Sequence, residues 1–256
     1  MPERPIPAPD RRTDAAALRA AAVTVVTVCR NPGKLLEQAI ASVAALRRDD
    51  VAHVVIDGAS SDGTQAYLRA MPTPIAHWQS EPDDGIYDAM NKGWAVAGAQ
   101  SYVLFLGADD RLESLPSAAE LAQARARGAV LIIGDATVGD VPFPSRYTEE
   151  LRFGNTLHHQ ALLVYKRAHP SPPFDARLRV YGDWDFNLRL WKQGARAEQL
   201  VSLRSRVGPG GVSSSQPLGE TLRIAGRHEG LWHAAFLGCW MAKKRVIALM
   251  RHVRGG

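Results

Sequence analysis

The sequence predicts an α/β fold in which a mostly parallel sheet is flanked by helices. The chain has 256 residues, of which 46% are hydrophobic and 22% charged, so it is long enough to bury one large core. Short β-branched runs alternate with segments of helical periodicity, which is typical of parallel sheets covered on both faces. Acidic residues follow three of the predicted strands, and ligands of such sheets bind at the carboxyl ends of the strands.

The first two predicted units each consist of a strand and a helix. Residues 23–29, VTVVTVC, form a β-branched run, and an apolar helical stripe follows over residues 36–46. The next run, VAHVVID, ends at Asp57 before a Gly/Ser turn in which Ser60 or Ser61 is placed to cap the following helix.

Two more strands complete the first half. PIAHWQSEP predicts a third strand, GIYDAMNKGWAVAGA a helix, and SYVLFLG a fourth strand. Glu81, Asp83 and Asp84 follow the third strand, and Asp109 and Asp110 follow the fourth. Together with Asp57, they bring carboxylates to one edge of the sheet.

The pattern changes after residue 111. A helix in SAAELAQARARG and a strand in AVLIIGDA lead to the Pro-rich stretch VPFPSRYTEE, which marks the passage to the second half. There, LHHQALLVYKRA predicts a strand, and the sequence from Asp183 predicts a helix. GPGGVSSS is a loop that either closes over a ligand or only connects elements.

The N-terminus and the cysteines indicate an intracellular protein. The first twenty residues are rich in Pro, Arg and Asp and lack the apolar core of a signal peptide, so we expect a loose tail. Cys29 and Cys239 have no metal-ligand spacing, which is typical of thiols in a reducing compartment. The expected location is therefore the cytoplasm.

The net charge of +5 is concentrated at the C-terminal end, where no acid follows Glu229. On a helix, apolar residues from Trp232 to Val253 share one side, with most basic residues elsewhere. Residues 231–254 either lie on an anionic membrane surface or pack on their own domain with a solvated basic face. Their longest apolar stretch is shorter than the roughly 18 residues of a membrane span. Nucleic acid is not an expected partner, because no zinc-finger, helix-turn-helix or RNP signature accompanies the charge.

Two adjacent carboxylates end the run FLGADD at residues 105–110. Asp109 and Asp110 would repel each other if both stayed charged and unpaired. With no Cys or His cluster nearby, such a pair suits a hard divalent cation, Mg2+ or Mn2+, which is usually shared with phosphate oxygens. An Asp-Asp turn without a ligand is the alternative.

Seven segments, in their order and spacing, resemble the family 2 glycosyltransferases with the GT-A fold, whose Rossmann-like sheet is mostly parallel. The resemblance covers residues 22–216 and is greatest to the branch that builds bacterial exopolysaccharide, the colanic acid type. The segments are TVVTVCRNPG, VIDGASSDGT, SEPDDGIYDAMNKG, FLGADD, HHQALLVY, YGDWDFNLRL and GGVSS.

The resemblance implies transfer of a sugar from a nucleotide diphosphate sugar to an acceptor hydroxyl, usually with inversion at the anomeric carbon. Asp109 and Asp110 occupy the family's metal motif, with Asp110 as the direct ligand and Asp109 toward the ribose or metal-bound water. Asp183 stands where the family carries the base that takes the acceptor's proton. Asp185 is expected to be structural and to pair with Arg189.

Further residues that are expected to bind the nucleotide lie at or after the ends of the first three predicted strands. Asp57 either accepts a hydrogen bond from the base or ribose, or only closes its turn. Lys92 either meets phosphate or pairs with Asp88. The expected nucleotide-binding residues are Thr27, Arg30, Asp57, Asp84 and Lys92.

His158 and His159 open the predicted strand of the second half. Alternation along a strand places them on opposite faces. We expect His159 to face the site and to touch phosphate or the acceptor, and its neighbour to face solvent or the core.

The expected organisation is a tail over 1–21, a nucleotide-sugar-binding half over 22–111, an acceptor-binding and catalytic-base half over 112–216, and a helical extension over 217–256. A lipid-linked saccharide at the cytoplasmic face of the inner membrane is one acceptor that would suit this basic extension.

Two other functions stay open: a non-catalytic protein that binds sugar nucleotides or glycans on the same fold, and a sugar-phosphate nucleotidyltransferase. The sequence lacks the Gly-rich N-terminal loop that a sugar-phosphate nucleotidyltransferase needs. The presence of all three acids, Asp109, Asp110 and Asp183, favours catalysis over simple binding.

Overall fold

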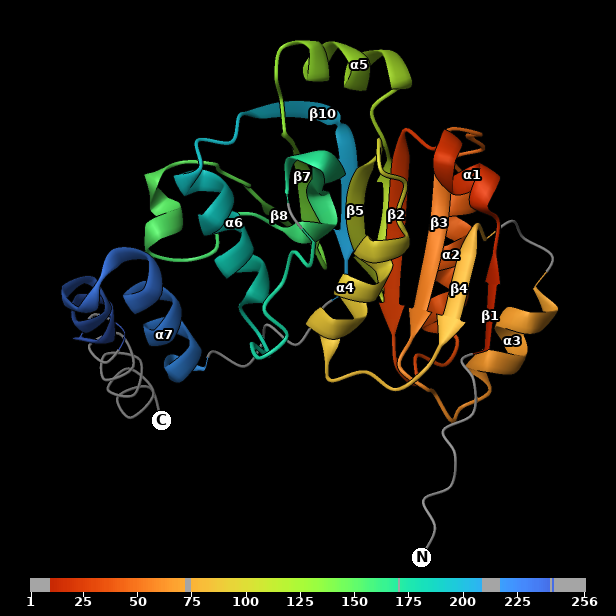
Figure 1. Cartoon of the computed structure of the whole chain (residues 1–256), viewed down its shortest axis with the longest axis horizontal. Coiled ribbons are helices and arrows are strands. Elements are labelled where there is room, and N and C mark those ends of the chain that lie inside the picture. Colours follow the sequence, from red (N-terminus) through yellow and green to blue (C-terminus); the bar gives the residue numbers. More distant parts are fainter. Residues whose placement is uncertain (1–9, 72–74, 170, 209–216, 240, 242–256) are drawn as a thin grey trace, which may run out of the picture.

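The computed structural model describes residues 10–71, 75–169, 171–208, 217–239 and 241. A ten-stranded sheet with the order β1-β4-β3-β2-β5-β9-β7-β10-β6, and β8 paired to β7, forms the centre of the molecule (Figure 1). The strands are β1 (Asp10–Thr13), β2 (Val23–Cys29), β3 (Val51–Asp57), β4 (His77–Ser80), β5 (Tyr102–Gly107), β6 (Arg111–Ser114), β7 (Leu131–Val138), β8 (Val141–Phe143), β9 (Leu162–Tyr165) and β10 (Ala197–Val207).

Helices cover the sheet and extend beyond one end of it. Figure 1 shows α6 and α7 beside each other at the end of the molecule opposite to β1. The α-helices are α1 (Ala15–Ala20), α2 (Leu35–Ala44), α3 (Thr64–Ala70), α4 (Ile86–Val96), α5 (Ala118–Ala126), α6 (Gly182–Lys192) and α7 (Leu218–Glu229). Short 3-10 helices are η1 (Glu149–Arg152), η2 (His159–Ala161) and η3 (Lys166–Ala168).

The predicted mostly parallel sheet is confirmed. Strands β4, β3, β2 and β5 pair in parallel, and β7 and β10 run in the same direction, because β9 is antiparallel to both β5 and β7. All seven residues of β2 are buried, as expected for a central strand that is covered on both faces.

The core has one layer on each face of the sheet. Alternate side chains of β2 enter different layers: Val26 packs with Trp94 of α4, and Val25 packs with Ala39 of α2. A Cβ atom at Gly93 would collide with Val26, so this glycine allows α4 to lie close against β2. The close packing holds the N-terminal end of α4 beside the carboxyl ends of β2 and β5.

Part of the predicted N-terminal tail is ordered. Residues 10–13 form β1, which pairs antiparallel with β4, and Asp14 caps α1 by accepting hydrogen bonds from two backbone N–H groups. The polar composition of this segment suggested a loose tail, but an edge strand needs only backbone pairing and one covered face. Residues 1–9 lie outside the described part of the chain.

Two local predictions were wrong, and one strand was not predicted. The α3 helix begins after Gly63 without a side-chain cap, and Ser60 instead donates to Asp57. The strand expected to begin at His158 begins at Leu162, after the 3-10 turn η2. The long strand β10 was not predicted, since the sequence analysis assigned no element to the segment between the predicted helix from Asp183 and the GPGGVSSS loop.

The described part of the C-terminal extension has one buried and one exposed side. Residues 231–239 are helical; Ala234 and Leu237 are buried, whereas Trp232 and Phe236 have exposed fractions of 92% and 57%. Within the described residues, the structure contains no helix whose length and hydrophobicity would allow it to cross a membrane. Residue 240 and residues 242–256, which carry most of the predicted basic charge, lie outside the described part.

Candidate active site

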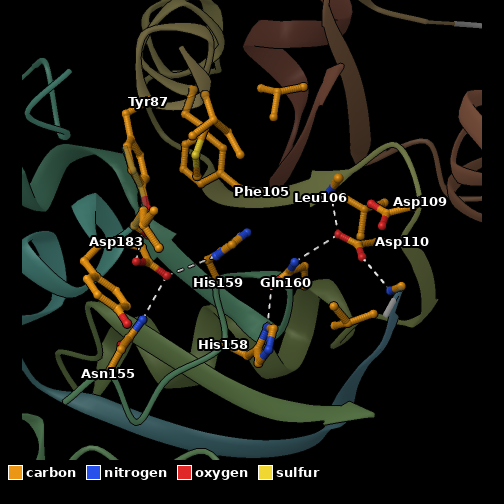
Figure 2. A pocket seen from close by; sticks show the side chains of 18 of the residues that line it. Tyr87, Phe105, Leu106, Asp109, Asp110, Asn155, His158, His159, Gln160 and Asp183 are labelled. Carbon is orange, nitrogen blue, oxygen red and sulfur yellow. Dashed lines mark hydrogen bonds and ion pairs between the residues drawn. The ribbon is translucent and has the colours of Figure 1, made fainter. Parts of the chain in front are cut away.

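A cavity of about 1190 Å³ opens at the carboxyl ends of β2 and β5 and extends to η2 and the start of α6. It is lined by five of the residues that the sequence predicted for the site: Arg30, Asp109, Asp110, His159 and Asp183. Figure 2 shows Asp109 and Asp110 on one side of this cavity and Asp183 on the other, with His159 between them.

The Asp110 carboxylate is buried and is held by three N–H donors. Its Oδ2 atom accepts from Gly107 N at 2.7 Å and from Gln160 Nε2 at 3.0 Å, and its Oδ1 atom accepts from Gly208 N at 3.0 Å. A Cβ atom at Gly107 would lie 2.7 Å from Asp110 Oδ2, so the absence of a side chain there makes room for the carboxylate. The sharp turn after β5 therefore fixes the orientation of Asp110.

The neighbouring Asp109 carboxylate is exposed. Partial desolvation, followed by the charge of Asp110, raises the pKa of Asp109. A cation beside the pair would remove this repulsion.

These two carboxylates fit a hard divalent cation. The described residues hold no cluster of three or more His, Cys, Asp or Glu that could bind a metal ion unaided. Mg2+ in proteins is commonly bound by one or two carboxylates together with phosphate oxygens and water. The donor set of Asp109 and Asp110 therefore matches a cation that a diphosphate brings with it.

On the other side of the cavity, both oxygens of Asp183 accept hydrogen bonds. Trp184 N donates to Oδ1 at 2.8 Å, and Tyr87 Oη lies 3.3 Å from the same atom. Asn155 Nδ2 donates to Oδ2 at 2.8 Å, and His159 Nδ1 lies 3.2 Å from it. The side chain of Asp183 is 13% exposed, so the acid is ordered and largely shielded.

The 3-10 turn η2 connects the two sides. His159 contacts Asp183, and the next residue, Gln160, donates to Asp110. The amide oxygen of Gln160 also lies 2.5 Å from His158 Nδ1, which orients the amide (Figure 2). Burial, followed by the charge of His159, lowers the pKa of His158, so His158 is neutral at neutral pH.

The prediction for the two histidines was therefore only half right. His159 faces the site as expected, but its described partner is the carboxylate of Asp183. His158 lines the same cavity, because a 3-10 turn does not place neighbouring residues on opposite faces as a strand does.

The segment that leads into α6 is anchored by the C-terminal extension. The Glu220 carboxylate of α7 accepts from three consecutive backbone N–H groups, those of Arg179 at 2.6 Å, Val180 at 2.9 Å and Tyr181 at 3.0 Å. Arg179 itself lines the cavity and donates to the backbone oxygen of Asp84. The extension thus positions the backbone just before Asp183.

Asp185, two residues after Asp183, points away from the cavity and joins α6 to α7. Its buried carboxylate lies 3.2 Å from Arg189 Nε, 3.0 Å from Arg227 Nη1 and 2.9 Å from His228 Nε2. Burial alone would raise the pKa of Asp185, but the hydrogen bond from His228 and the charges of Arg189, His228 and Arg227 lower it overall. The predicted structural role and the pairing with Arg189 agree with this geometry.

Four predicted nucleotide-binding residues do not line the cavity. Thr27 is fully buried and lies 2.9 Å from His53 Nε2; burial lowers the pKa of His53 to about 4, so this contact is neutral. Asp57 is also fully buried and accepts from Ser60 N at 3.0 Å and Ser80 Oγ at 2.6 Å, which is the role of a turn acid.

The other two lie near the cavity but face elsewhere. Lys92 forms ion pairs with Glu81 at 3.0 Å and Asp88 at 3.2 Å, as its structural alternative predicted. Asp84 is exposed outside the cavity, while its neighbour Asp83 lines it. The position of Asp83 and Asp84 after a strand did not reveal which of the two faces the cavity.

Sequence reasoning missed several residues of the site. Gln160 lies in the quoted HHQ motif, and Tyr87 lies in the quoted DDGIYDAMNKG segment, so a signal for both was present. Asn155 and Glu220 lie in segments without a motif, and only their contacts reveal them. The predicted loop over 208–215 is described only at Gly208, so its closure lies outside the described residues.

Comparison with known proteins places the chain in a family. The sequence model of the family described as "Glycosyl transferase family 2" matches residues 24–180, more than half of the chain. An uncharacterized glycosyltransferase of Mycobacterium tuberculosis is 36% identical over 136 residues, which cover 48% of this chain and 52% of the relative. A PGL/p-HBAD biosynthesis glycosyltransferase of the same species is 29% identical over 182 residues, covering 67% of this chain and 70% of the relative. The chain thus spans about half the length of the first of these relatives.

Two solved structures share the fold. Residues 1–349 of S. aureus TarS, in complex with UDP-GlcNAc, superpose with a TM-score of 0.62 at 15% identity, covering 81% of this chain and 66% of that chain. A mannosyltransferase from Pyrobaculum calidifontis, in complex with GDP-Man and Mn2+, gives a TM-score of 0.61 at 19% identity, covering 99% of this chain and 80% of that chain. The predicted α/β architecture is the GT-A fold, and this chain belongs to glycosyl transferase family 2.

Proposed function

We propose that this protein transfers a sugar from a nucleotide diphosphate sugar to a hydroxyl group of a saccharide acceptor, with inversion at the anomeric carbon. One observation carries the proposal: the Asp109–Asp110 pair and the Asp183–His159 pair face a single cavity from two sides, and η2 connects them. The cavity volume of about 1190 Å³ leaves room for a donor and an acceptor together.

The donor binds on the Asp110 side. Asp110, with Asp109 beside it, would hold Mg2+ or Mn2+, and a cation bound there neutralises charge on the leaving diphosphate. Arg30 and Arg179 line the cavity as two further positive groups that a diphosphate attracts. Asp110 is oriented before the donor arrives, because three N–H groups already fix its carboxylate.

The acceptor binds on the Asp183 side. Inversion in a single step requires a proton acceptor on the face of the sugar opposite to the leaving group. The Asp183–His159 pair lies across the cavity from Asp109 and Asp110, which is the arrangement that this step requires (Figure 2). The acceptor hydroxyl is thereby directed at the anomeric carbon of a donor held at Asp110.

The donor nucleotide and the product can be proposed as chemical classes. The two solved structures bind UDP-GlcNAc and GDP-Man, so a uridine and a guanosine nucleotide are the first candidates. The relative named for PGL/p-HBAD biosynthesis supports a product that is a glycan of the cell surface, such as an exopolysaccharide.

Calorimetry with a panel of nucleoside diphosphates in the presence of Mn2+ tests the donor site. We expect one nucleotide to bind and its affinity to fall when the metal is chelated, because the two carboxylates alone repel a diphosphate. Incubation of the matching nucleotide sugar with saccharide acceptors should then yield a glycoside of inverted configuration. A folded protein that binds no nucleotide, with or without metal, would favour a glycan-binding role instead.

We further propose that the acceptor is a lipid-linked saccharide at the anionic cytoplasmic face of the membrane. The described helix over 231–239 exposes Leu231, Trp232 and Phe236, and basic residues follow it in the sequence. Amphipathic helices with aromatic side chains on one face and basic charge nearby bind anionic lipid surfaces.

The double substitution Trp232→Ser and Phe236→Ser is expected to weaken binding to vesicles that contain anionic lipid by at least about tenfold, because it removes two aromatic side chains from the lipid contact. Co-sedimentation of the full chain with such vesicles at low salt measures this effect. Val201→Ser, which removes another side chain of 77% exposure from β10, serves as the control and should leave binding unchanged. Equal binding by the wild type and the double variant would contradict the proposed membrane contact.

A further inference from the structure

The backbone that leads into α6 is held by two other helices. On α7, Oε2 of Glu220 accepts from Val180 N at 2.9 Å and from Tyr181 N at 3.0 Å. The other oxygen of Glu220 accepts from Arg179 N at 2.6 Å. On α4, Tyr87 Oη donates to the backbone oxygen of Val180 at 2.6 Å. The N–H and the C=O group of Val180 are thus fixed by different helices.

The fixed backbone lies next to the proposed catalytic base. A Cβ atom at Gly182 would lie 2.8 Å from the ring of Tyr87, so glycine allows the chain to pack directly against this ring. Asp183 follows in the first turn of α6 and lines the cavity. Only Gly182 separates Asp183 from the last N–H group that Glu220 binds, that of Tyr181.

Three consecutive N–H groups that converge on one carboxylate define the conformation of the backbone between them. Such N–H groups form a concave anion site whose shape depends on the local backbone angles. In this protein the anion is the side chain of Glu220, which comes from α7 and not from a ligand. Tyr181, the residue before α6, has no side-chain cap. The carboxylate of Glu220 therefore holds residues 179–181 in the conformation from which α6 begins.

We propose that Glu220 is a positioning residue for the transfer reaction: by holding residues 179–181, it keeps Asp183 directed into the cavity. This role rests on the proposed sugar transfer. Glu220 acts through the backbone and does not touch the reacting atoms. It lies beyond residues 24–180, which the family model matches, so this role makes the C-terminal extension a working part of the acceptor side.

The opposite end of α7 provides a matched control. Glu229 forms ion pairs with Arg152 at 2.7 Å and with Lys192 at 3.0 Å. These partners are side chains of η1 and of the last residue of α6, whereas Glu220 binds the backbone before α6. Glu229→Gln and Glu220→Gln therefore make the same chemical change on the same helix, but only the second alters the support of residues 179–181.

Amide hydrogen exchange tests the contact without any substrate. In Glu220→Gln, an amide NH2 in either orientation faces at least one N–H group, because both oxygens of Glu220 accept. We expect this variant of the full chain to exchange the amides of residues 179–181 at least about tenfold faster than the wild type. Glu229→Gln should leave these three rates unchanged. Wild-type exchange rates in Glu220→Gln would overturn the proposed support.

Transfer kinetics test the effect on the reaction. We expect Glu220→Gln to lower kcat by about tenfold to 100-fold and to change the dissociation constant of the Mn2+–nucleotide complex by less than about twofold, because a small displacement of a catalytic group slows the chemical step. Calorimetry also counts nucleotide-binding sites, so kcat is expressed per folded molecule. Loss of stability alone would lower the number of sites and leave kcat per site unchanged. Glu229→Gln should retain the wild-type kcat per site.

The outcomes separate this role from the proposed function. If Glu220→Gln exchanges the three amides faster but transfers sugar with the wild-type kcat per site, other contacts position Asp183 and the role of Glu220 is overturned. Equal losses of kcat in Glu220→Gln and Glu229→Gln would also overturn it, since the effect would then belong to α7 as a whole. No transfer by the wild type from any nucleotide sugar would overturn the proposed function, and this role with it.

Discussion

Asp110→Asn is expected to weaken binding of the Mn2+–nucleotide complex by at least about 100-fold. The substitution removes one of the two negative charges that face the cation. It also places an amide NH2 against N–H donors, because Oδ2 of Asp110 accepts from Gly107 and Gln160 and Oδ1 accepts from Gly208. In either amide orientation at least one buried donor loses its acceptor, which disfavours the geometry that the cation requires.

Calorimetry on Asp110→Asn and on a matched control separates this local effect from unfolding. Asp140→Asn makes the same chemical change at a side chain that is fully exposed and pairs with Arg206. We expect the control to bind the nucleotide as the wild type does. If Asp110→Asn is folded and binds the Mn2+–nucleotide complex with unchanged affinity, the cation site lies elsewhere.

Asp183→Asn is expected to lower the rate of sugar transfer by on the order of 1,000-fold while leaving nucleotide affinity nearly unchanged. Trp184 N donates to one oxygen of Asp183 and Asn155 Nδ2 to the other, so an amide NH2 in either orientation faces one of these donors. The loss of the negative charge removes the group that is proposed to take the acceptor's proton. The donor side is spared, because Asp110 is held by Gly107, Gln160 and Gly208 and has no contact with Asp183.

Transfer kinetics and nucleotide calorimetry on the same preparation check this separation. The expected pattern is a lower kcat with an unchanged dissociation constant of the Mn2+–nucleotide complex. Equal losses in both quantities would instead indicate that Asp183 maintains the whole cavity. The Asp140→Asn variant again supplies the comparison for the chemical change alone.

The family and the main elements could be predicted from sequence because they depend on local patterns. The β-branched runs that became β2, β3 and β5 are buried on both faces, and such runs are recognised from a few consecutive residues. The position of Asp110 follows from the same local pattern, since a parallel strand delivers the next residues to the ligand-binding edge. The assignment of Asp183 came from the motif that contains it.

Residues whose partners are distant in sequence could not be assigned in the same way. Thr27 and Asp57 lie near the carboxyl ends of strands, as Asp110 does. The hydroxyl of Thr27 nevertheless contacts His53, and the carboxylate of Asp57 contacts Ser80. Their polar atoms are therefore paired inside the core. Nothing in the local sequence distinguishes a strand-end acid that turns inward from one that faces a cavity.

The sequence by itself therefore determined the alternating strands and helices from β2 to β5, the acidic edge of the sheet and the family. Only the tertiary structure decided that Asp183 is enclosed by Tyr87, Asn155 and His159, which come from three segments between 24 and 96 residues away in the chain. Short-range periodicity reports which face of a strand or helix is buried. The contacts that orient a proton acceptor depend on how those faces pack against one another, and packing is a property of the folded chain.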